Sequence, residues 1–374
     1  MKAPEEASNI YLPETSVKSR YDYLIYIGRF QPFHLGHKHV VETACAISDN
    51  VIILCGSCNV PRTTKNPFTF AERQDYIEKV FENTKYKNQI IVNGLDDCAS
   101  NSEWIIQVQN KIHVLTKADL NDNIKIGIVG HQKDDSSWYL EKLNVDFFEV
   151  GIYLDEKNVA HRPVDSTNIR RNFFRNEMHD IPLPDEMTYW LKTWSETSWE
   201  TYEYLQKEEK YITEYRASWG DYGNSPFPVQ FITVDAVVIQ QGHILLIKRK
   251  TQPGKDLWAL PGGFLNENET LRQGVLRELM EETKLKVPPK ILATHIQDQN
   301  PIPFDSPGRS SRGRTLTHVF LFNLQADPED GLSRVKGSDD AKEAKWFPLN
   351  EFEKMPKQMF EDHYFIGEHF IKQL

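Results

Sequence analysis

The sequence predicts an α/β protein of two domains, a doubly wound parallel sheet followed by a smaller α+β domain. Three observations support this. In the first half, short apolar runs alternate with helical stretches, as is typical of a parallel sheet. In the second half, two strand-like runs meet at Gln241–Gly242, a hairpin signal, and a Glu-rich helical stretch follows. Between the halves, residues 220–226 read Gly-Asp-Tyr-Gly-Asn-Ser-Pro, a turn-rich break.

The domain boundaries follow from these composition changes. A chain of 374 residues is long enough for two domains with separate cores. We expect a flexible leader at residues 1–20, a first domain with its closing helices at 21–219, a linker at 220–229 and a second domain at 230–374.

The composition argues against several classes of protein. The formal net charge of -10 argues against nucleic acid as the main partner. No apolar run is long enough for a membrane span, and residues 1–20 are too polar for a secretory signal. Four cysteines indicate a reducing compartment. We therefore expect a cytoplasmic protein with no membrane partner, and nothing in the composition excludes a homo-oligomer.

The elements of the first domain follow from apolar periodicity and capping residues. Thr69 is a good N-cap, and Glu72 lies in the first turn of the helix after it. A β-α alternation of this kind places ligands at the carboxyl ends of the strands. We expect strands at residues 23–27, 51–54, 89–92 and 124–129, helices at 37–48, 70–81 and 104–115, and helical structure over 185–219.

The stretch Gly28–His37, read Gly-Arg-Phe-Gln-Pro-Phe-His-Leu-Gly-His, joins the first strand to the first helix. A strand-to-helix turn presents backbone N–H groups and a helix N-terminus to a phosphate. Gly28 would let the backbone approach a ligand. His34 and His37 are three residues apart, so both imidazoles can face one pocket if the helix begins between them. The alternative is a loop with two surface histidines.

A second pattern that suits phosphate is Asp165–Arg170, read Asp-Ser-Thr-Asn-Ile-Arg. Ser166 or Thr167 can cap a helix whose N-terminus favours an anion. Arg170 lies one turn into that helix, and its guanidinium offers a fixed fork to phosphate oxygens. The alternative is a capped surface helix with a solvated arginine.

These two motifs resemble the nucleotidyltransferase signature, in which a Gly, an aromatic residue and a Pro precede His-x-x-His, and its Ser/Thr-x-x-Arg companion. Three further stretches resemble segments of nicotinamide-mononucleotide adenylyltransferases: Lys65–Arg73, Asn101–Trp104 and Gly130–Leu140. The third of these resembles a segment of the bifunctional members of that family. The resemblance implies a Rossmann-like nucleotidyltransferase domain.

The resemblance also implies residue roles. His34, His37 and Arg170 would be catalytic, stabilising charge on the triphosphate of ATP and on the departing pyrophosphate. Trp104 would pack on the pyridine ring of the mononucleotide, because a flat indole suits a flat, electron-poor ring. Core packing at a helix start is the alternative for Trp104. The other substrate-binding residues implied are Gly28, Arg29, Phe30, Gly130, Ser166, Thr167 and Arg73, the last near the substrate phosphate.

The second domain carries the most specific pattern in the chain. From Gly263 it reads Gly-x5-Glu269-x7-Arg277-Glu278-Leu-x-Glu281-Glu282. The last three glutamates stand at i, i+3 and i+4, so their carboxylates can converge on one helix face. Hard oxygen ligands of this kind suit Mg²⁺ or Mn²⁺. A solvated acidic helix face is the alternative.

This pattern resembles the Nudix box, except that Lys284 stands where the box ends in Gly. The resemblance implies that Glu278, Glu281 and Glu282 bind the metal, that Glu281 and Glu282 also act in catalysis, and that Arg277 pairs with Glu269. The missing Gly usually adopts a left-handed conformation, which costs another residue roughly 1 kcal/mol, partly offset by a cation at a helix C-terminus.

Two later stretches resemble the ADP-ribose branch of Nudix hydrolases. Arg309, Arg312 and Arg314 lie in a Gly/Ser-rich loop and could meet a diphosphate or a ribose; a flexible basic loop is the alternative. Glu343 lies in a late acidic segment and is a candidate general base, with a surface glutamate as the alternative.

Together the motifs resemble one family, the bifunctional nicotinamide-mononucleotide adenylyltransferase/Nudix hydrolases. That resemblance implies that ATP and nicotinamide mononucleotide give NAD and pyrophosphate, that ADP-ribose and water give AMP and ribose 5-phosphate, and that the cofactor is Mg²⁺ or Mn²⁺. Two alternatives stay open. The acceptor could be another phosphorylated compound, such as nicotinate mononucleotide or pantetheine phosphate, and the Nudix domain could be a ligand-sensing module.

Overall fold

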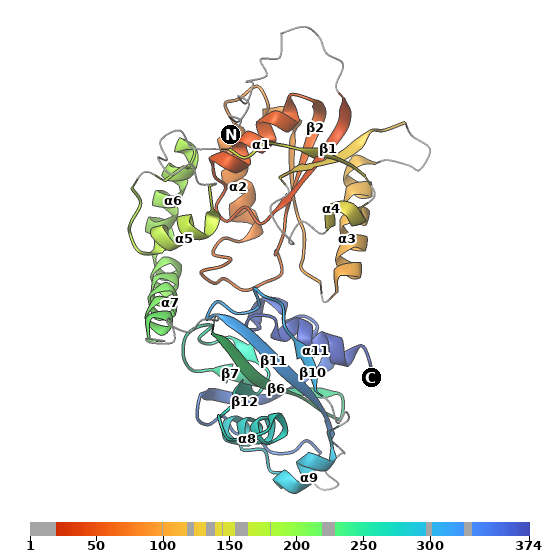
Figure 1. Ribbon diagram of the computed structural model, residues 1–374, viewed down its shortest axis with the longest axis vertical. Helices are drawn as coiled ribbons and strands as arrows, with labels where there is room; N and C mark the ends of the chain where they lie inside the picture. The colour runs from red at the N-terminus through yellow and green to blue at the C-terminus, as the bar shows by residue number, and fades with distance from the viewer. Residues whose placement is uncertain are drawn as a thin grey trace, which may run out of the picture.

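The computed structural model describes residues 20–98, 100–117, 123–131, 139–143, 145–153, 164–179, 181–218, 229–296, 301–324 and 331–374. Nearly all of the expected leader and of the expected linker, and most of the Gly130–Leu140 stretch, lie outside these ranges. The described chain forms two sheets, one in the upper and one in the lower part of Figure 1.

The first sheet has five parallel strands in the order β3-β2-β1-β4-β5. Four of them were predicted. The fifth, β5, is a four-residue strand of sequence Asp-Phe-Phe-Glu, too short and too polar at its ends to give a periodic signal. Strands β2 and β3 extend the sheet on one side of β1, and β4 and β5 extend it on the other, so the order of strand addition reverses at β1. The carboxyl end of β1 is therefore the expected ligand site. The strands are β1 (Tyr21–Gly28), β2 (Ser48–Cys55), β3 (Ile90–Gly94), β4 (Ile126–Gly130) and β5 (Asp146–Glu149).

Helices cover both faces of this sheet, and the alternation along β2 shows how. Val51 and Ile53 belong to the core cluster under α1 and α2, whereas Ile52 and Leu54 belong to the cluster under α3. The expected N-cap of α2 is confirmed, since Thr69 and Glu72 form a capping box. The helices are α1 (Leu35–Cys45), α2 (Phe70–Phe81), α3 (Asn101–Thr116), α4 (Tyr139–Lys142) and α5 (Ser166–Phe174), with a 3-10 turn at Lys87–Gln89.

Two long helices, α6 (Asp185–Thr197) and α7 (Trp199–Ala217), close the first domain, in agreement with the predicted helical stretch. Trp190 and Trp194 of α6 pack edge-on against Phe68, which precedes α2. Helix α7 packs on α5 and extends to the second sheet (Figure 1), where the Tyr204 hydroxyl donates to the Lys255 carbonyl at 3.2 Å. It therefore contacts both domains.

The second sheet is mixed, with the order β10-β11-β6-β7-β12 and with β8 and β9 pairing to β7 and β6. The predicted hairpin is confirmed between β6 and β7, where Gln241 and Gly242 both have positive φ, as a two-residue turn requires. The strands are β6 (Gln230–Gln240), β7 (His243–Arg249), β8 (Trp258–Ala259), β9 (Gly262–Phe264), β10 (Ile302–Phe304), β11 (Arg314–Leu324) and β12 (Ala341–Pro348).

Helix α8 covers one face of this sheet and α11 the other. Val275 and Leu279 of α8 share a buried cluster with alternate residues of β6, and Ile366 of α11 belongs to the cluster on the opposite face. None of the helices in the described ranges has the length and apolar content needed to cross a membrane. The helices are α8 (Leu271–Thr283), α9 (Pro289–Thr294), α10 (Leu349–Phe352) and α11 (His363–Ile371), with a 3-10 turn at Pro356–Gln358.

Helix α8 ends as its sequence predicts. Lys284 is the C-cap in the left-handed region, with φ 46°, and its N–H donates to the Met280 carbonyl at 3.1 Å. The lysine thus adopts the backbone conformation that glycine usually supplies.

We expect Lys284→Gly to stabilise the protein by up to about 1 kcal/mol, because glycine relieves the left-handed backbone. Lys286→Gly is the matched control, since Lys286 is not among the positive-φ positions and glycine there only raises the entropy of the unfolded chain. Thermal unfolding of both variants checks this. Equal destabilisation by the two changes would contradict it.

Candidate active sites

His34 and His37 lie face to face at the start of α1. His34 is the N-cap, and its Nδ1 accepts from the His37 backbone N–H, while Nδ1 of His37 accepts from the His34 N–H, both at 3.3 Å. Their ring centroids are 3.6 Å apart. Because each Nδ1 accepts, each neutral ring carries its proton on Nε2. The helix begins between the two histidines, as the spacing required.

Gly28 and Phe30 support this pair in a way that the sequence did not indicate. Phe30 has φ 51° and is 1% exposed, and its ring packs edge-on against His37 with centroids 5.0 Å apart. A Cβ on Gly28 would stand 2.9 Å from that ring, so Gly28 makes room for Phe30. The Phe30 ring therefore packs beneath the histidines, and the expected role of Phe30 in substrate binding stays a prediction.

Arg170 of α5 is 6% exposed and is held by backbone carbonyls. Its Nε donates to the Thr64 carbonyl at 3.0 Å and its Nη1 to the Gln31 carbonyl at 2.5 Å. Burial and, second to it, the positive charge of nearby Arg29 lower the pKa of Arg170 to about 10. Neutral carbonyls hold the guanidinium in place, so its charge is left for an anion.

The N-cap of α5 differs from the expectation. Asp165, not Ser166 or Thr167, caps the helix, and its carboxylate accepts from the Thr167 N–H at 2.9 Å. Capping needs a side chain just before the first helical residue, and the helix begins one residue earlier than expected. The Ser166 hydroxyl instead donates to the Pro32 carbonyl at 3.4 Å, and the Thr167 hydroxyl accepts from Arg170 at 3.2 Å.

A strongly basic pocket of about 410 Å³ opens beside Arg170. Positive side chains dominate its lining, which is the arrangement that a polyphosphate needs. Gly308 and Ser311 of the second domain form part of its wall. The cations that line it are Arg29, Lys65, Arg170, Arg171, Arg175 and Arg216, and Glu209 accompanies them.

A second cavity of about 500 Å³ lies next to it and also between the domains. Trp104, in the first turn of α3, lines this cavity and makes an edge-on contact with Tyr139, with ring centroids 5.4 Å apart. Lys65 and Asp97 line it from the first domain, and Glu361 lines it from the second. Trp104 is thus on a cavity wall and not in the closed core.

Arg73 does not reach either cavity. It has no exposed surface, and its guanidinium donates to the carbonyls of Arg29 at 2.9 Å, of Ser57 at 3.3 Å and of Gly56. The side chain ties together the loops that follow β1 and β2, and its expected contact with the substrate phosphate stays a prediction. Gly130 ends β4, where its carbonyl accepts from the Val150 N–H at 2.8 Å.

In the second domain, Arg277 joins the carboxylates of the Glu-rich helix. It donates to both oxygens of Glu269 at 2.9 and 2.6 Å, which confirms the predicted pair. Its Nη1 also donates to Glu278 at 2.8 Å and to Glu281 at 3.0 Å. One guanidinium nitrogen thus lies between two of the three predicted ligands, and these two carboxylates converge.

Glu282 is buried where α8 packs against β9, the strand that also lies beside Glu278. It is 5% exposed and accepts from the Gly262 N–H at 2.9 Å. Burial, together with the negative charge of Glu278, raises its pKa to about 8. A Cβ on Gly263 would stand 2.6 Å from Oε1 of Glu278, so glycine is required where the loop meets the helix.

The donor set suits a divalent cation in its chemistry. Among the residues that the structure describes, no three Asp, Glu, His or Cys side chains are arranged as a ready metal site. Burial raises the pKa of Glu278 as well as that of Glu282, so ionising these carboxyl groups is unfavourable without a nearby cation. A hard cation would relieve this, with Arg277 giving way between Glu278 and Glu281.

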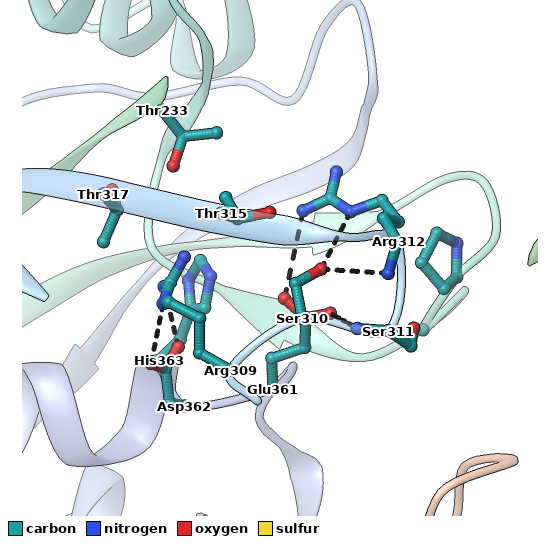
Figure 2. A network of polar contacts seen from close by, with 12 residues as sticks. Thr233, Arg309, Ser310, Ser311, Arg312, Thr315, Thr317, Glu361, Asp362 and His363 are labelled. Atoms are coloured by element: carbon teal, nitrogen blue, oxygen red, sulfur yellow. Dashed lines mark hydrogen bonds and ion pairs between the residues drawn. The ribbon is translucent and has the colours of Figure 1, made fainter. Parts of the chain in front are cut away.

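The three arginines of the loop before β11 have different partners, and Figure 2 shows two of them, Arg309 and Arg312. Arg309 is 8% exposed and binds Asp362 through two bonds of 2.9 and 2.8 Å. Arg312 lies 5.1 Å over the ring of Phe264, next to the Nudix-box loop. Arg314 is the first residue of β11 and donates to the Asp305 carbonyl. Of the three arginines, Arg312 is therefore the one nearest to the Glu-rich helix in its contacts.

Glu343 lies exposed on the edge strand β12, in register with Lys248 of β7.

Asp235, which the sequence analysis missed, is closer to the acidic site. It is buried on β6, its pKa is raised to about 6 by burial, and a Cβ on Gly262 would stand 2.3 Å from its Oδ1. A lone aspartate inside an apolar strand was the signal that could have found it.

Comparison with known proteins agrees with this geometry. A Cytidylyltransferase-like family model matches residues 25–172 and a NUDIX domain model matches residues 229–369. The nicotinamide/nicotinic acid mononucleotide adenylyltransferase of Acinetobacter baylyi is 32% identical over 189 residues, 50% of this chain and 94% of that protein. The ADP-ribose pyrophosphatase of Methanocaldococcus jannaschii is 36% identical over 138 residues, 37% of this chain and 72% of that protein.

One solved structure matches nearly the whole chain. It is a bifunctional NMN adenylyltransferase/ADP ribose pyrophosphatase from Francisella tularensis, complexed with AMP and a Mn ion, with 34% identity and a TM-score of 0.82. The match covers 94% of this chain and 99% of that one. This chain belongs to the bifunctional NMN adenylyltransferase/ADP-ribose pyrophosphatase family.

In this family member, the sequence did not indicate that residues of the Nudix domain line a cavity of the adenylyltransferase domain. Ser306, Gly308 and Glu361 of the Nudix domain line the cavity that holds Trp104. Glu208 of α7 lines it as well. No local motif marks these positions, because they meet the adenylyltransferase domain only through tertiary packing.

We expect Arg73→Met to destabilise the protein by more than about 2 kcal/mol, because three buried carbonyls lose a charged donor. Denaturant unfolding measures this. Lys79→Met, which removes an exposed ion pair from the same helix, is the control and should cost less than about 0.5 kcal/mol. If Arg73→Met instead has the stability of the wild type and a raised KM for either substrate, Arg73 acts in substrate binding.

The raised pKa of Glu282 predicts that the stability of the protein depends on pH when a chelator keeps divalent metal away. Its folded pKa of about 8 lies above the ordinary 4.5, so the stability it contributes is complete below pH 4.5 and is lost as the pH rises through 8. Relative to Glu282→Gln, the wild-type protein should lose about 1.4 kcal/mol for each unit of this shift. Melting temperatures at pH 5, 7 and 9 test this, with exposed Glu267→Gln as the control. A constant difference between the wild type and Glu282→Gln would contradict it.

Proposed function

We propose that the chain catalyses two reactions, transfer of AMP from ATP to nicotinamide mononucleotide and hydrolysis of ADP-ribose. The observation that carries the first is the basic pocket beside stacked His34 and His37 at the carboxyl end of β1, adjoining a cavity lined by Trp104. The relatives named above support both substrates. We also propose domains at 21–219 and 230–374, and a cytoplasmic location, which four unpaired cysteines support.

In adenylyl transfer, a phosphate oxygen of the mononucleotide attacks the α-phosphorus of ATP. The new P–O bond replaces the bond to pyrophosphate, so no enzyme nucleophile is needed. His34 and His37 would donate from Nε2 to triphosphate oxygens. Arg29 and Arg170 would stabilise the charge that grows on the leaving pyrophosphate. Trp104 would stack on the pyridine ring.

In ADP-ribose hydrolysis, a water oxygen bonds to a phosphorus of the diphosphate and the bridging P–O bond breaks, giving AMP and ribose 5-phosphate. Glu278, Glu281 and Glu282 would hold Mg²⁺ or Mn²⁺. When bound, such a cation polarises phosphate oxygens and lowers the pKa of water. We assign the water proton to Glu281 and not to Glu343, because Glu281 lies on the carboxylate-bearing face and its side chain is 44% exposed. Arg312 would contact the diphosphate.

The experiment is a crossed assay on the full-length chain. Arg170→Lys should lower kcat/KM for NAD synthesis about 100-fold and leave ADP-ribose hydrolysis unchanged. Glu282→Gln should do the reverse. NAD formation is followed with ATP and nicotinamide mononucleotide, with nicotinate mononucleotide and pantetheine phosphate as competing acceptors. Preference for another acceptor, or hydrolysis that survives Glu282→Gln, would overturn the corresponding assignment.

A further inference from the structure

A buried carboxylate joins the two domains. Glu208 of α7 is 1% exposed, and its Oε2 accepts from the Thr64 N–H at 2.7 Å. Its Oε1 accepts from the Gly254 N–H at 3.2 Å. Thr64 lies in the loop between β2 and α2 of the first domain, and Gly254 lies after β7 in the second. One side chain therefore links backbone groups of both domains.

The bond to Thr64 leads directly to Arg170. The Thr64 carbonyl accepts from Arg170 Nε at 3.0 Å, and Thr64 is itself buried. The backbone N–H that donates to Glu208 and the carbonyl that accepts from Arg170 both belong to Thr64 and are attached to its Cα. Fixing the first group therefore limits the directions open to the second. Through Thr64, Glu208 restrains the guanidinium that faces the basic pocket.

The Nudix side of this link is rigid. Gly254 has φ +70°, and a Cβ there would stand 2.3 Å from the ring of Phe360. The carbonyl of Pro253 accepts from Arg249 Nε at 2.9 Å, and the Arg249 guanidinium lies 4.0 Å over the same Phe360 ring. The loop that holds Glu208 is therefore packed and bonded on two sides.

A second contact holds the neighbouring residue. Lys65 Nζ donates to the Gly308 carbonyl of the Nudix domain at 2.8 Å. Gly308 also lines both cavities between the domains. Thr64 and Lys65 are consecutive, so the Nudix domain holds this segment of the adenylyltransferase site at two points, one direct and one through Glu208.

We propose that Glu208 is a positioning residue for adenylyl transfer, which uses the Nudix domain as a fixed support to hold Thr64 and, through it, Arg170 at the triphosphate of ATP. This rests on the proposed role of Arg170. The Nudix domain is then a structural part of the adenylyltransferase site, in addition to any reaction of its own.

The test compares Glu208→Gln and Glu208→Ala in the full-length chain. Gln keeps one acceptor oxygen, so it should raise the KM for ATP about tenfold, and Ala should raise it more. The KM for the mononucleotide should change less than about twofold, and so should ADP-ribose hydrolysis. Glu203→Gln, on an exposed turn of the same helix, is the matched control and should behave as wild type.

A double-mutant cycle shows whether the effect passes through Arg170. In an Arg170→Lys background, Glu208→Gln should raise the KM for ATP less than about twofold further, because the partner it positions is already gone. Fully additive effects would overturn the proposal.

Three other results would overturn it as well. An unchanged KM for ATP would show that Thr64 needs no such support. A rise confined to the KM of the mononucleotide would place Glu208 in direct contact with that substrate, whose cavity it lines. Equal loss of both activities would indicate a general role in folding. If the unchanged chain forms no NAD, the proposed function fails and this inference with it; if only the Glu208 variants match wild type, this inference alone fails.

Discussion

Both sites depend on buried ionisable side chains that are held in place by backbone N–H and C=O groups. Arg170 is held by the carbonyls of Gln31 and Thr64, Glu208 by two N–H groups, and Glu282 by the Gly262 N–H. A neutral dipole can stabilise a buried charge without cancelling it. The charge therefore remains available to a ligand or to a neighbouring element, and the loops that supply the dipoles are fixed by the same bonds.

The two sites use this principle with opposite signs. The first gathers arginines and Lys65 around a pocket, where a bound polyphosphate would relieve their mutual repulsion. The second gathers carboxylates on α8, where Arg277 lies between Glu278 and Glu281. Arg277 thus balances charge that a divalent cation would otherwise balance. Each site is complementary to a phosphate ligand, directly in one case and through a cation in the other.

Glycines make both arrangements sterically possible. Gly28 leaves room for the Phe30 ring beneath His37, and Gly263 leaves room for the Glu278 carboxylate above the sheet. In each case a side chain that the motif assigns to ligand binding packs against the Cα of a glycine. The glycines of these motifs therefore act through packing and not only through approach of the backbone to a ligand.

The amino-acid sequence was enough to predict the features that depend on residues a few positions apart. These are the alternation of strands and helices in the first sheet, the Thr69 cap, the meeting of His34 and His37, the Arg277–Glu269 pair and the left-handed Lys284. Spacing alone decides such contacts, because helix and turn geometry repeat over three or four residues. Long-range packing was needed to show that Arg73 and Phe30 are buried, that Asp235 lies beside Gly262, and that Glu208 bonds to Thr64, 144 residues away. Contacts between distant segments depend on how whole elements pack, and no local pattern records that.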